Sequence, residues 1–385
     1  MPTERSGQAE ADTRTLLHVF STFAVGGPQI RTTTLANALG SAYRHIVLAM
    51  DGRYEAMARF APDINARALD LPMRKSRAVS LGNLRSLRRA FRETRPDLLL
   101  TYNFGALEAV LAAGLGRRFG LLHHEDGFGP DESQGQKARR LWLRRFALRL
   151  ADRVYLPSKT LEHIARSSWY LPASRLVFIP NAIAMPERRP VPLAPPAFPD
   201  GPGSVRIISL AALRAEKDLG RLIAAFAGMP AALEARLIIY GEGQERSALE
   251  AEIARLNVGD RVALPGATSD PWAALAGADI YALSSRTEQM PISILEAMAS
   301  GLPVAGVDVG DVRHMLAADN QPFIMSRNDP DALRDALIRL AQDAGLRERV
   351  GAANACHVDA HYRQERMVAR VDALYRELAG AGSSA

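Results

Sequence analysis

Two glutamates eight positions apart, Glu288 and Glu296, stand in the stretch with the clearest chemical pattern. The apolar run at 279–285 is typical of a buried strand, and a helix is predicted to begin near Pro291, where a missing backbone donor costs nothing. Glu288 then lies in the loop and Glu296 lies about a turn into the helix. Because a carboxylate can accept two hydrogen bonds from a vicinal diol, this arrangement suits recognition of hydroxyl groups. The alternative is a helix-capping acid and a surface acid.

The start of that helix is a second candidate feature. The backbone N–H groups of Met290, Ile292 and Ser293 are expected to face the loop, because the first N–H groups of a helix have no acceptor within it. Such groups can hold hydroxyls or an anion.

Two cations, Arg214 and Lys217, follow the apolar run at 206–212 and precede a helical segment, a position where cations meet phosphates. The alternative is a solvated charge pair. The chain has only four lysines against 44 arginines. A lysine here therefore favours a functional role, since a compact ammonium differs from a planar guanidinium.

Gly26 and Gly27 fall where a loop turns into a helix, and glycines there let backbone amides approach an anion. A tight turn without a ligand is an equal alternative. The sequence has no GxGxxG and no GxxxxGK[ST], so dinucleotide and P-loop interpretations lose their usual support.

These candidates follow short apolar runs that alternate with helix-period segments. The runs lie at 16–20, 45–50, 97–103, 120–125, 153–158 and 175–180, and then at 206–212, 236–243, 261–267, 279–285 and 303–310. This alternation predicts two doubly wound α/β domains, each with a parallel sheet buried on both faces. In such domains ligands bind beyond the carboxyl ends of the strands.

A segment with seven prolines, 184–203, reads as a semi-rigid linker between the halves. The predicted domains are 1–183 and 204–357, with a helix and tail at 358–385 that we expect to pack back on the first domain. The stretch 329–378 is predicted to be helical throughout, and the last seven residues to be frayed.

The composition, 48% hydrophobic and 23% charged, excludes a chain that is mainly disordered. No window resembles a membrane span, and the first fifteen residues lack the apolar stretch of a secretory signal, so a cytoplasmic location is expected. A single cysteine, Cys356, permits no internal disulfide. Reading it with His357 and His361 as metal ligands is set aside, and we expect no metal and no cofactor.

The net charge of +6 is unevenly distributed. Residues 1–180 hold 27 Lys and Arg against 16 Asp and Glu, whereas the remainder is acidic. This asymmetry indicates an anionic partner for the first domain, such as a membrane surface contacted from the inner face, and no nucleic-acid module is found. The basic segment 137–153 contains Trp142, Leu143, Phe146 and Leu150. It is expected to form a helix that packs its apolar side on the sheet and exposes its arginines, and an interfacial helix is the alternative.

With these residues in place, the chain resembles the retaining glycosyltransferases of family 4. Glu288 and Glu296 match the family's E-x7-E signature, within EQMPISILEAMASGLPVAGVDVG. GG at 26–27, IPNAI at 179–183, LRAEK at 213–217, YGEGQERSALE at 240–250 and VALPGA at 262–267 follow in the family's order. The resemblance covers most of the chain.

The resemblance implies a GT-B fold, in which two Rossmann-like domains face each other across a cleft. It also implies a nucleotide-sugar donor held mainly by the second domain, without a metal. Glu296 would bind the ribose diol and Glu288 the donor sugar. Arg214 and Lys217 would neutralise the diphosphate, with Gly26 and Gly27 closing against it. The implied donor set also includes Gly241, Gln289, Met290, Pro291 and Ile292.

Three departures from the family pattern are present. Ala212 stands where the family often has arginine, and Gln289 where it commonly has glycine. In HHEDGFG at 123–129, Asp126 occupies the place of the family's histidine, so Asp126 is the first choice to assist the acceptor hydroxyl and His123 or His124 the second. At least one of those histidines is expected to be structural, because neighbouring strand residues point to opposite faces.

The expected function is retaining transfer of a glycosyl group to an acceptor hydroxyl, in the assembly of a cell-surface polysaccharide or glycolipid. The alternatives are a sugar-nucleotide epimerase or hydrolase on the same scaffold, and a nucleotide-sugar-binding protein without catalysis.

Overall fold

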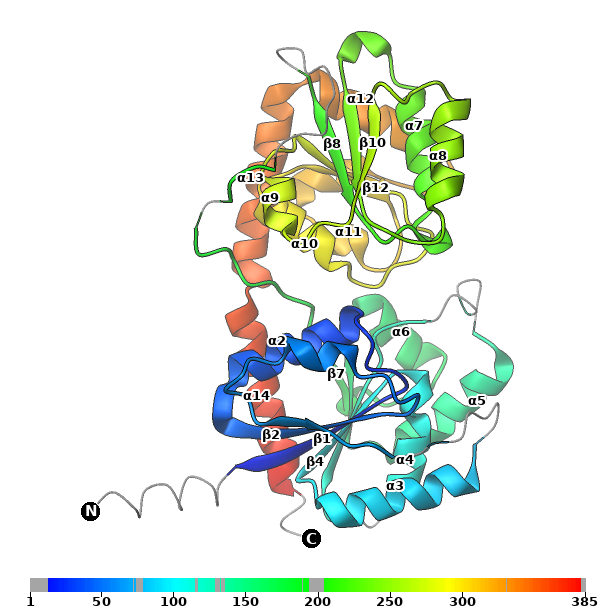
Figure 1. Cartoon of the computed structure of the whole chain (residues 1–385), viewed down its shortest axis with the longest axis vertical. Coiled ribbons are helices and arrows are strands. Elements are labelled where there is room, and N and C mark those ends of the chain that lie inside the picture. Colours follow the sequence, from blue (N-terminus) through cyan, green and yellow to red (C-terminus); the bar gives the residue numbers. More distant parts are fainter. Residues whose placement is uncertain are drawn as a thin grey trace, which may run out of the picture. The chain divides into compact units, whose positions relative to one another are not determined.

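The computed structural model describes residues 13–71, 73, 79–114, 117–128, 132, 136–188, 190–193, 204–329 and 331–381. The first twelve residues, part of the basic run at 73–95, most of the proline-rich linker, Gly129 and the last four residues lie outside the described set. Two compact units are present, one made of residues 1–179 with 366–385 and one of residues 180–365. Figure 1 shows a parallel sheet flanked by helices in each.

The first unit is built on a seven-stranded parallel sheet in the order β3-β2-β1-β4-β5-β6-β7. Its strands are β1 (Arg14–Phe20), β2 (Tyr43–Ala49), β3 (Ala66–Ala68), β4 (Leu98–Tyr102), β5 (Gly120–His124), β6 (Arg153–Leu156) and β7 (Leu176–Phe178). Its helices are α2 (Gly27–Leu39), α3 (Leu81–Thr94), α4 (Leu107–Ala113), α5 (Ala138–Ala147), α6 (Lys159–Ser167) and α14 (Gln364–Ala381).

The two faces of this sheet differ in chemistry. Helices α3, α4, α5 and α6 pack on the face that holds Leu17, Leu99 and Leu121. The opposite face carries a row of rings on neighbouring strands, in which His18 stacks on His45 and His124 stacks on Tyr102. Helix α14 covers part of this second face, where Tyr375 meets the ring of Tyr43.

The second unit holds a six-stranded parallel sheet in the order β10-β9-β8-β11-β12-β13. Its strands are β8 (Arg206–Leu210), β9 (Arg236–Tyr240), β10 (Val262–Gly266), β11 (Ile280–Leu283), β12 (Val304–Val307) and β13 (Ile324–Met325). Its helices are α7 (Leu219–Ala227), α8 (Arg246–Arg255), α9 (Pro271–Leu275), α10 (Ile292–Ala299), α11 (Val312–Met315), α12 (Ala332–Gln342) and α13 (Ala344–His361).

Two hydrophobic cores sandwich this second sheet. Leu222 of α7, Leu249 of α8 and Leu337 of α12 share one core. Leu275 of α9 and Leu295 of α10 belong to the other. Because residues along each strand alternate between the two cores, both faces of the sheet are apolar, as the continuous runs in the sequence predict.

The doubly wound parallel architecture predicted for both halves is confirmed, and every predicted apolar run contains a strand. The helical character predicted for 329–378 is confirmed, with short breaks between three helices. The chain there forms α12, α13 and α14, and Asp343 separates the first two because its side chain accepts a hydrogen bond from the N–H of Leu346 and caps α13.

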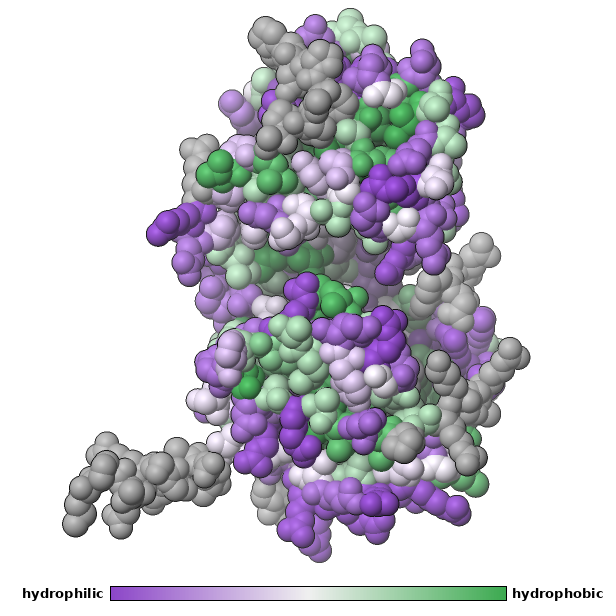
Figure 2. All heavy atoms as spheres, in the orientation of Figure 1, coloured by the Kyte–Doolittle hydropathy of each residue, from purple (hydrophilic) through white to green (hydrophobic). Residues whose placement is uncertain are grey.

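The surface is largely polar, and Figure 2 shows hydrophilic side chains over much of the visible face of the molecule. Within the described part of the chain, no helix is both long enough and apolar enough to cross a membrane. The helix at 138–147 packs on the sheet as expected, with Leu143 against the core, but Trp142 and Phe146 do not take part, because both side chains are about two-thirds exposed, at 67% and 65%.

Candidate active site

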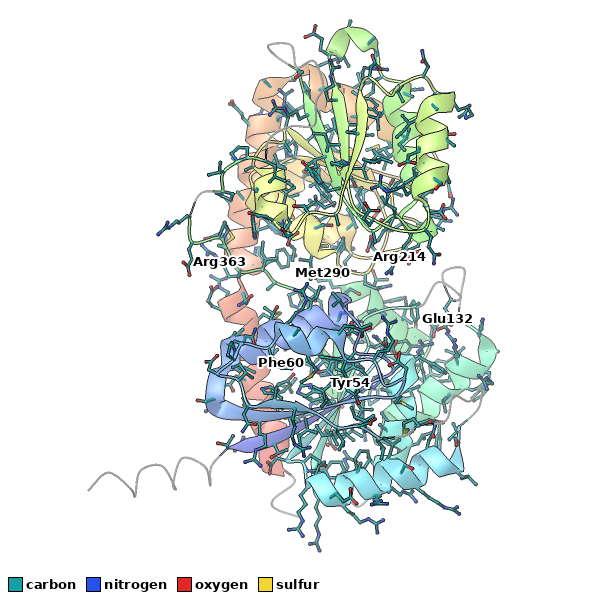
Figure 3. The ribbon with its side chains drawn as sticks, viewed as in Figure 1. Tyr54, Phe60, Glu132, Arg214, Met290 and Arg363 are labelled. Atoms are coloured by element: carbon teal, nitrogen blue, oxygen red, sulfur yellow. The ribbon has the colours of Figure 1, made fainter. Side chains whose placement is uncertain are left out.

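The loops at the carboxyl edge of the second sheet come together because glycines allow close backbone contact. A Cβ on Gly241, after β9, would lie 1.8 Å from the carbonyl oxygen of Ala211, after β8. The neighbouring N–H of Leu213 donates to the carbonyl of Glu242 at 2.9 Å. Gly241 therefore supports the loop that carries Arg214. Figure 3 places Arg214 and Met290 at this end of the second sheet.

Lys217 and Glu288 form the central ion pair of this edge. The Nζ of Lys217 lies 2.6 Å from Oε1 of Glu288, and the hydroxyl of Ser285 donates to the same oxygen at 2.7 Å. Lys217 ends a short 3₁₀ turn, Ala215–Lys217, whereas Ser285 and Glu288 follow β11. The pair joins the two strand ends that the sequence singles out and leaves the lysine a quarter exposed, at 25%.

Arg214 lies directly before that turn and is exposed. Its guanidinium forms no ion pair with the carboxylates of the described chain. The two cations therefore differ, since Lys217 is held by Glu288 whereas Arg214 is available to an anionic ligand.

Glu296 lies in α10, and the loop residue Glu288 precedes that helix, as the spacing predicts. Burial raises the pKa of Glu296 to about 7. Ile292 and Ser293 form the first turn of the same helix, where backbone N–H groups have no acceptor within the helix. Hydroxyl groups of a ligand would donate to this desolvated carboxylate and stabilise its charged form.

The loop between Glu288 and Pro291 is fixed by its neighbours. Gly310 has a φ of +57°, and a Cβ there would lie 2.2 Å from the carbonyl oxygen of Glu288. Asp311 donates its N–H to the carbonyl of Gln289 at 2.9 Å. The Nδ2 group of Asn181 donates to the carbonyl of Met290 at 2.8 Å. Backbone contacts on both sides therefore set the position of Glu288.

In the first unit, Gly26 and Gly27 begin α2. Gly26 is the N-cap residue in an extended conformation, and Pro28 follows in the first turn. A Cβ added to Gly27 would meet no atom within 4 Å, whereas a Cβ on Gly26 would press on the side chain of Gln29 at 2.8 Å. The helix start is thus open at Gly27 and ready for an anion.

Asp126 follows β5 and is paired with a buried arginine of α2. The Nη1 of Arg31 lies 2.5 Å from Oδ1 of Asp126, and the two side chains are 7% and 9% exposed. The side-chain oxygen of Asn103 accepts the N–H of Asp126 at 2.7 Å. Beneath the pair, the guanidinium of Arg31 lies 5.0 Å from the ring centre of Tyr155.

The two histidines before Asp126 lie on opposite faces of the sheet, and both are buried. His124 stacks between Tyr102 and Tyr155, and burial, assisted by Arg31, lowers its pKa well below the usual value. His123 bonds through Nδ1 to the hydroxyl of Thr101 at 2.8 Å. Neither ring reaches the surface, so burial favours Asp126 over the two histidines as the acceptor-side candidate.

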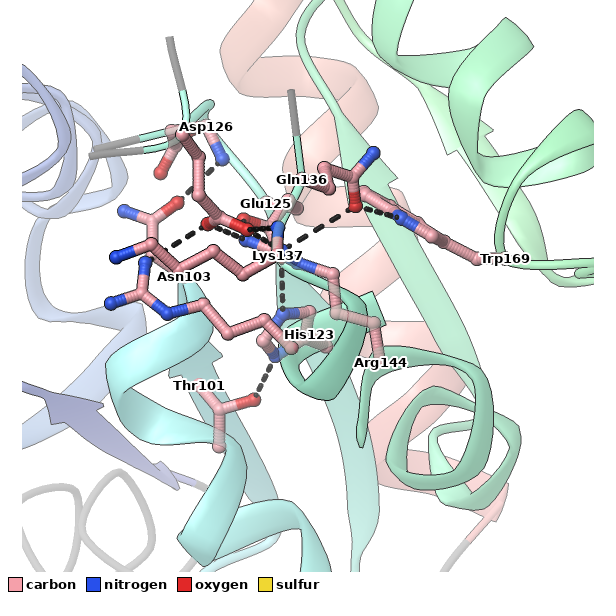
Figure 4. A network of polar contacts seen from close by, with 11 residues as sticks. Thr101, Asn103, His123, Glu125, Asp126, Gln136, Lys137, Arg144 and Trp169 are labelled. Atoms are coloured by element: carbon pink, nitrogen blue, oxygen red, sulfur yellow. Dashed lines mark hydrogen bonds and ion pairs between the residues drawn. The ribbon is translucent and has the colours of Figure 1, made fainter. Parts of the chain in front are cut away.

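The face that holds His123 contains a buried ionic network, seen in Figure 4. Arg144 of α5 lies 3.3 Å from Glu125 and 3.1 Å from Glu132. Burial acts to raise the pKa of Glu125, but Arg144 outweighs it and holds the pKa below the usual value. This network ties the residue before Asp126 to the helix that follows the loop.

Sequence reasoning missed Arg31 and Arg144, the two buried arginines among the described residues of the first unit. Neither has a distinctive neighbour in the sequence, and each is one of 44 arginines. The sequence feature that could have indicated them is an arginine at an apolar position of a helix that packs on the sheet.

No group of three or more His, Cys, Asp or Glu side chains in the described residues is arranged to hold a metal ion. Cys356 is exposed, and the rings of His357 and His361 lie 4.5 Å apart at the end of α13.

Two family models match the chain. The model of the glycosyl transferase 4-like domain matches residues 26–182, and the model of glycosyl transferases group 1 matches residues 198–355. Together they cover most of both units, and the second contains Arg214, Lys217, Glu288 and Glu296.

Curated relatives match over shorter segments. N-acetyl-alpha-D-glucosaminyl L-malate synthase of Bacillus anthracis is 26% identical over 172 residues, which is 45% of each chain. The GDP-mannose-dependent monoacylated alpha-(1-6)-phosphatidylinositol monomannoside mannosyltransferase of Corynebacterium glutamicum is 34% identical over 36% of this chain and 38% of its own. The matched segments thus span less than half the length of these two relatives.

Solved structures match the fold over nearly the whole chain. Sucrose-phosphate synthase of Thermosynechococcus elongatus gives a TM-score of 0.77 at 20% identity and covers 96% of this chain and 100% of its own. HepE of Anabaena, in complex with UDP and glucose, gives a TM-score of 0.75 at 17% identity and covers 95% and 100%. The fold is therefore GT-B, and the chain belongs to the group 1, family 4-type glycosyltransferases.

Proposed function

We propose that this protein transfers a glycosyl group from a nucleoside-diphosphate sugar to an acceptor hydroxyl, with retention of the anomeric configuration. The observation that carries the proposal is the Lys217–Glu288 ion pair beside the half-buried Glu296 and the exposed Arg214. Two cations and two carboxylates at one sheet edge match a ligand that has both phosphates and hydroxyls.

On the donor side, Arg214 and Lys217 bind the diphosphate and stabilise the charge that develops on it as it leaves. Glu296 accepts hydrogen bonds from the ribose diol. Glu288 contacts the donor sugar, and the backbone from Gln289 to Ile292 lines the same site. In the first unit, the start of α2 at Gly26 and Gly27 contacts the phosphates.

In the reaction, the bond from the anomeric carbon to the diphosphate oxygen breaks, and a bond from that carbon to the acceptor oxygen forms. The electron pair of the broken bond leaves with the diphosphate. The hydroxyl proton of the acceptor passes to the departing diphosphate oxygen, while Asp126 orients that hydroxyl through its carboxylate. Retention follows from the E-x7-E resemblance, and the anomeric configuration of the product, determined by NMR, tests it.

The acceptor is a polysaccharide or glycolipid under assembly. The names of the relatives support this class, since the mannosyltransferase of Corynebacterium glutamicum acts on a phosphatidylinositol monomannoside. That relative is GDP-mannose-dependent, whereas the structure of HepE contains UDP. A comparison of UDP and GDP in a binding assay identifies the nucleotide base.

Metal independence is part of the proposal, because Arg214 and Lys217 supply the positive charge at the diphosphate. Purified protein treated with EDTA is expected to keep its full transfer rate. A loss of rate that Mg²⁺ or Mn²⁺ restores would overturn this part of the proposal.

The test of the function is release of nucleoside diphosphate with and without acceptor glycans. Release that depends on acceptor and yields an elongated product supports transfer. Equal turnover without acceptor would instead indicate a hydrolase, and a changed sugar on an intact nucleotide would indicate an epimerase. Tight donor binding without turnover under any acceptor would indicate a non-catalytic binding protein.

A further inference from the structure

Three large aromatic side chains are exposed close together on the first unit. Trp142 and Phe146 of α5 are 67% and 65% exposed, and Tyr170, just after α6, is 57% exposed. They are the aromatic members of the large hydrophobic side chains that the described chain exposes. Exposing such side chains costs free energy in water, so a cluster of them marks an interaction surface.

An arginine joins these side chains into one patch. The guanidinium of Arg145 lies 5.0 Å from the ring centre of Trp142 and 4.5 Å from that of Tyr170. Its Nε donates to the carbonyl of Ser168 at 2.7 Å, which ties α5 to the end of α6. Trp142 and Phe146 are four residues apart on the helix and therefore share one face. We call Trp142, Arg145, Phe146 and Tyr170 the aromatic patch.

The surroundings of the aromatic patch are cationic. Arg139 is exposed on α5, Arg149 on the 3₁₀ turn that follows it (Leu148–Leu150), and Arg166 on α6. Helix α3 packs on the same face of the sheet and exposes four further arginines, namely Arg85, Arg88, Arg89, which is paired with Glu93, and Arg92. Aromatic side chains within a field of arginines are the composition of a helix that lies in the interface of an anionic bilayer.

We propose that the aromatic patch docks the first unit on the surface of an anionic lipid bilayer. Trp142, Phe146 and Tyr170 enter the headgroup region, and the surrounding arginines pair with lipid phosphates. Charge decides against a second copy of the chain, because two such faces would bring arginines against arginines. The inference is independent of the proposed function, and the binding experiment below requires no turnover.

The test is co-sedimentation of the full chain with vesicles of phosphatidylcholine alone or mixed with phosphatidylglycerol. We expect binding to the anionic vesicles, weakened by salt, and a shift of tryptophan emission to shorter wavelength. Trp142→Ala with Phe146→Ala should abolish most binding. Trp142→Phe should retain binding while losing most of the emission shift, which assigns that shift to Trp142.

A second set of variants tests the contribution of charge. Replacing Arg139 and Arg149 by glutamine should lower partitioning of the protein onto anionic vesicles about fivefold for each arginine. The matched control replaces Arg255 and Arg349, both exposed on the second unit, by glutamine and should bind as the unchanged protein does. Unfolding temperatures show whether each variant is folded. Equal binding to neutral and anionic vesicles, equal losses in both arginine pairs, or a dimer that the Trp142→Ala and Phe146→Ala changes dissociate would each overturn the proposal.

Discussion

The Nζ of Lys217 and the Oε1 of Glu288 lie 2.6 Å apart, joining the loop after β8 to the loop after β11. A lysine held in this way is already in position before a ligand arrives, so little side-chain entropy is lost when a phosphate binds. Because Ser285 donates to the same carboxylate oxygen, the other oxygen of Glu288 remains available to a sugar hydroxyl.

Donor affinity should depend on pH through Glu296, whose pKa burial raises to about 7. A nucleotide sugar is the right probe, because its diphosphate is esterified at both ends and has no proton that titrates between pH 6 and 8. As the carboxylate forms over that range, the dissociation constant is expected to fall about tenfold. Glu296→Gln should bind weakly with no such pH dependence. A flat profile in the unchanged protein, measured by calorimetry, would contradict the assignment.

Rising pH should lower the stability of the fold through Glu296, although it strengthens donor binding through the same residue. The folded pKa of Glu296 lies above its ordinary value of 4.5, so the folded state holds the extra proton between about pH 4.5 and 7. The stability contributed by this group is therefore present at low pH and lost as pH rises. Glu296→Gln should raise the free energy of unfolding at pH 8 by up to about 3 kcal/mol while it weakens donor binding.

Gly310→Ala should displace Glu288 and weaken donor binding at least tenfold. The new Cβ would lie 2.2 Å from the Glu288 carbonyl, and the φ of +57° adds strain. Gly301→Ala is the matched control, because its φ of +74° imposes similar strain while its Cβ meets no atom within 4 Å. Gly301→Ala should lose about 1–2 kcal/mol of stability and keep normal donor affinity, whereas Gly310→Ala should lose more stability because of its added clash. Equal affinities in the two variants would remove the support for this positioning.

Asp126→Asn should lower the rate of transfer at least about a hundredfold, as expected for a group acting on the acceptor hydroxyl. Donor affinity should stay within about twofold, because the donor contacts proposed for the second unit are unchanged. Arg31→Lys keeps a cation beside the carboxylate and should retain more activity than Asp126→Asn. If the asparagine variant transferred sugar normally in a kinetic assay, Asp126 would have no role at the acceptor.

Much of the fold was predictable because buried parallel strands are continuous apolar runs. Strand β3 was not, since its residues Ala66–Ala68 are largely exposed and read ARA. Strand β13 has only two residues, Ile324 and Met325, and is too short to form a pattern. These two strands at the edges of the sheets were therefore not predictable from the sequence, whereas the central strands were.

Some residues of the candidate site could be predicted from the sequence, and others could not. Lys217, Glu288 and Glu296 were predictable because each lies at a fixed distance from a strand end. The Arg31 partner of Asp126 was not, because the pair joins positions 95 residues apart and depends on how α2 packs over the sheet. The burial of His123 and His124 likewise follows from neighbouring strands, which a single run of sequence does not contain.

Arg144→Leu should destabilise the first unit by about 3–5 kcal/mol, because Glu125 would stay buried without its cation and Glu132 would keep only Arg140. Adding Glu125→Gln and Glu132→Gln should recover part of that loss. Arg139→Leu, an exposed arginine on the same helix, should change stability by no more than about 0.5 kcal/mol. Denaturant unfolding measures all three, and an equal cost for both arginines would show that the network stabilises nothing.

The central claim is that Lys217 holds the diphosphate of a nucleotide donor. A thermal-shift screen of the purified protein against nucleoside diphosphates and their sugars tests it most directly. At about one hundred times its dissociation constant, a ligand should add roughly 2.7 kcal/mol to stability and raise the unfolding temperature by several degrees. Lys217→Ala should abolish most of that shift, and Lys159→Ala, an exposed lysine of the first unit, should leave it intact. No shift with any nucleotide, or an equal shift in both lysine variants, would contradict the claim.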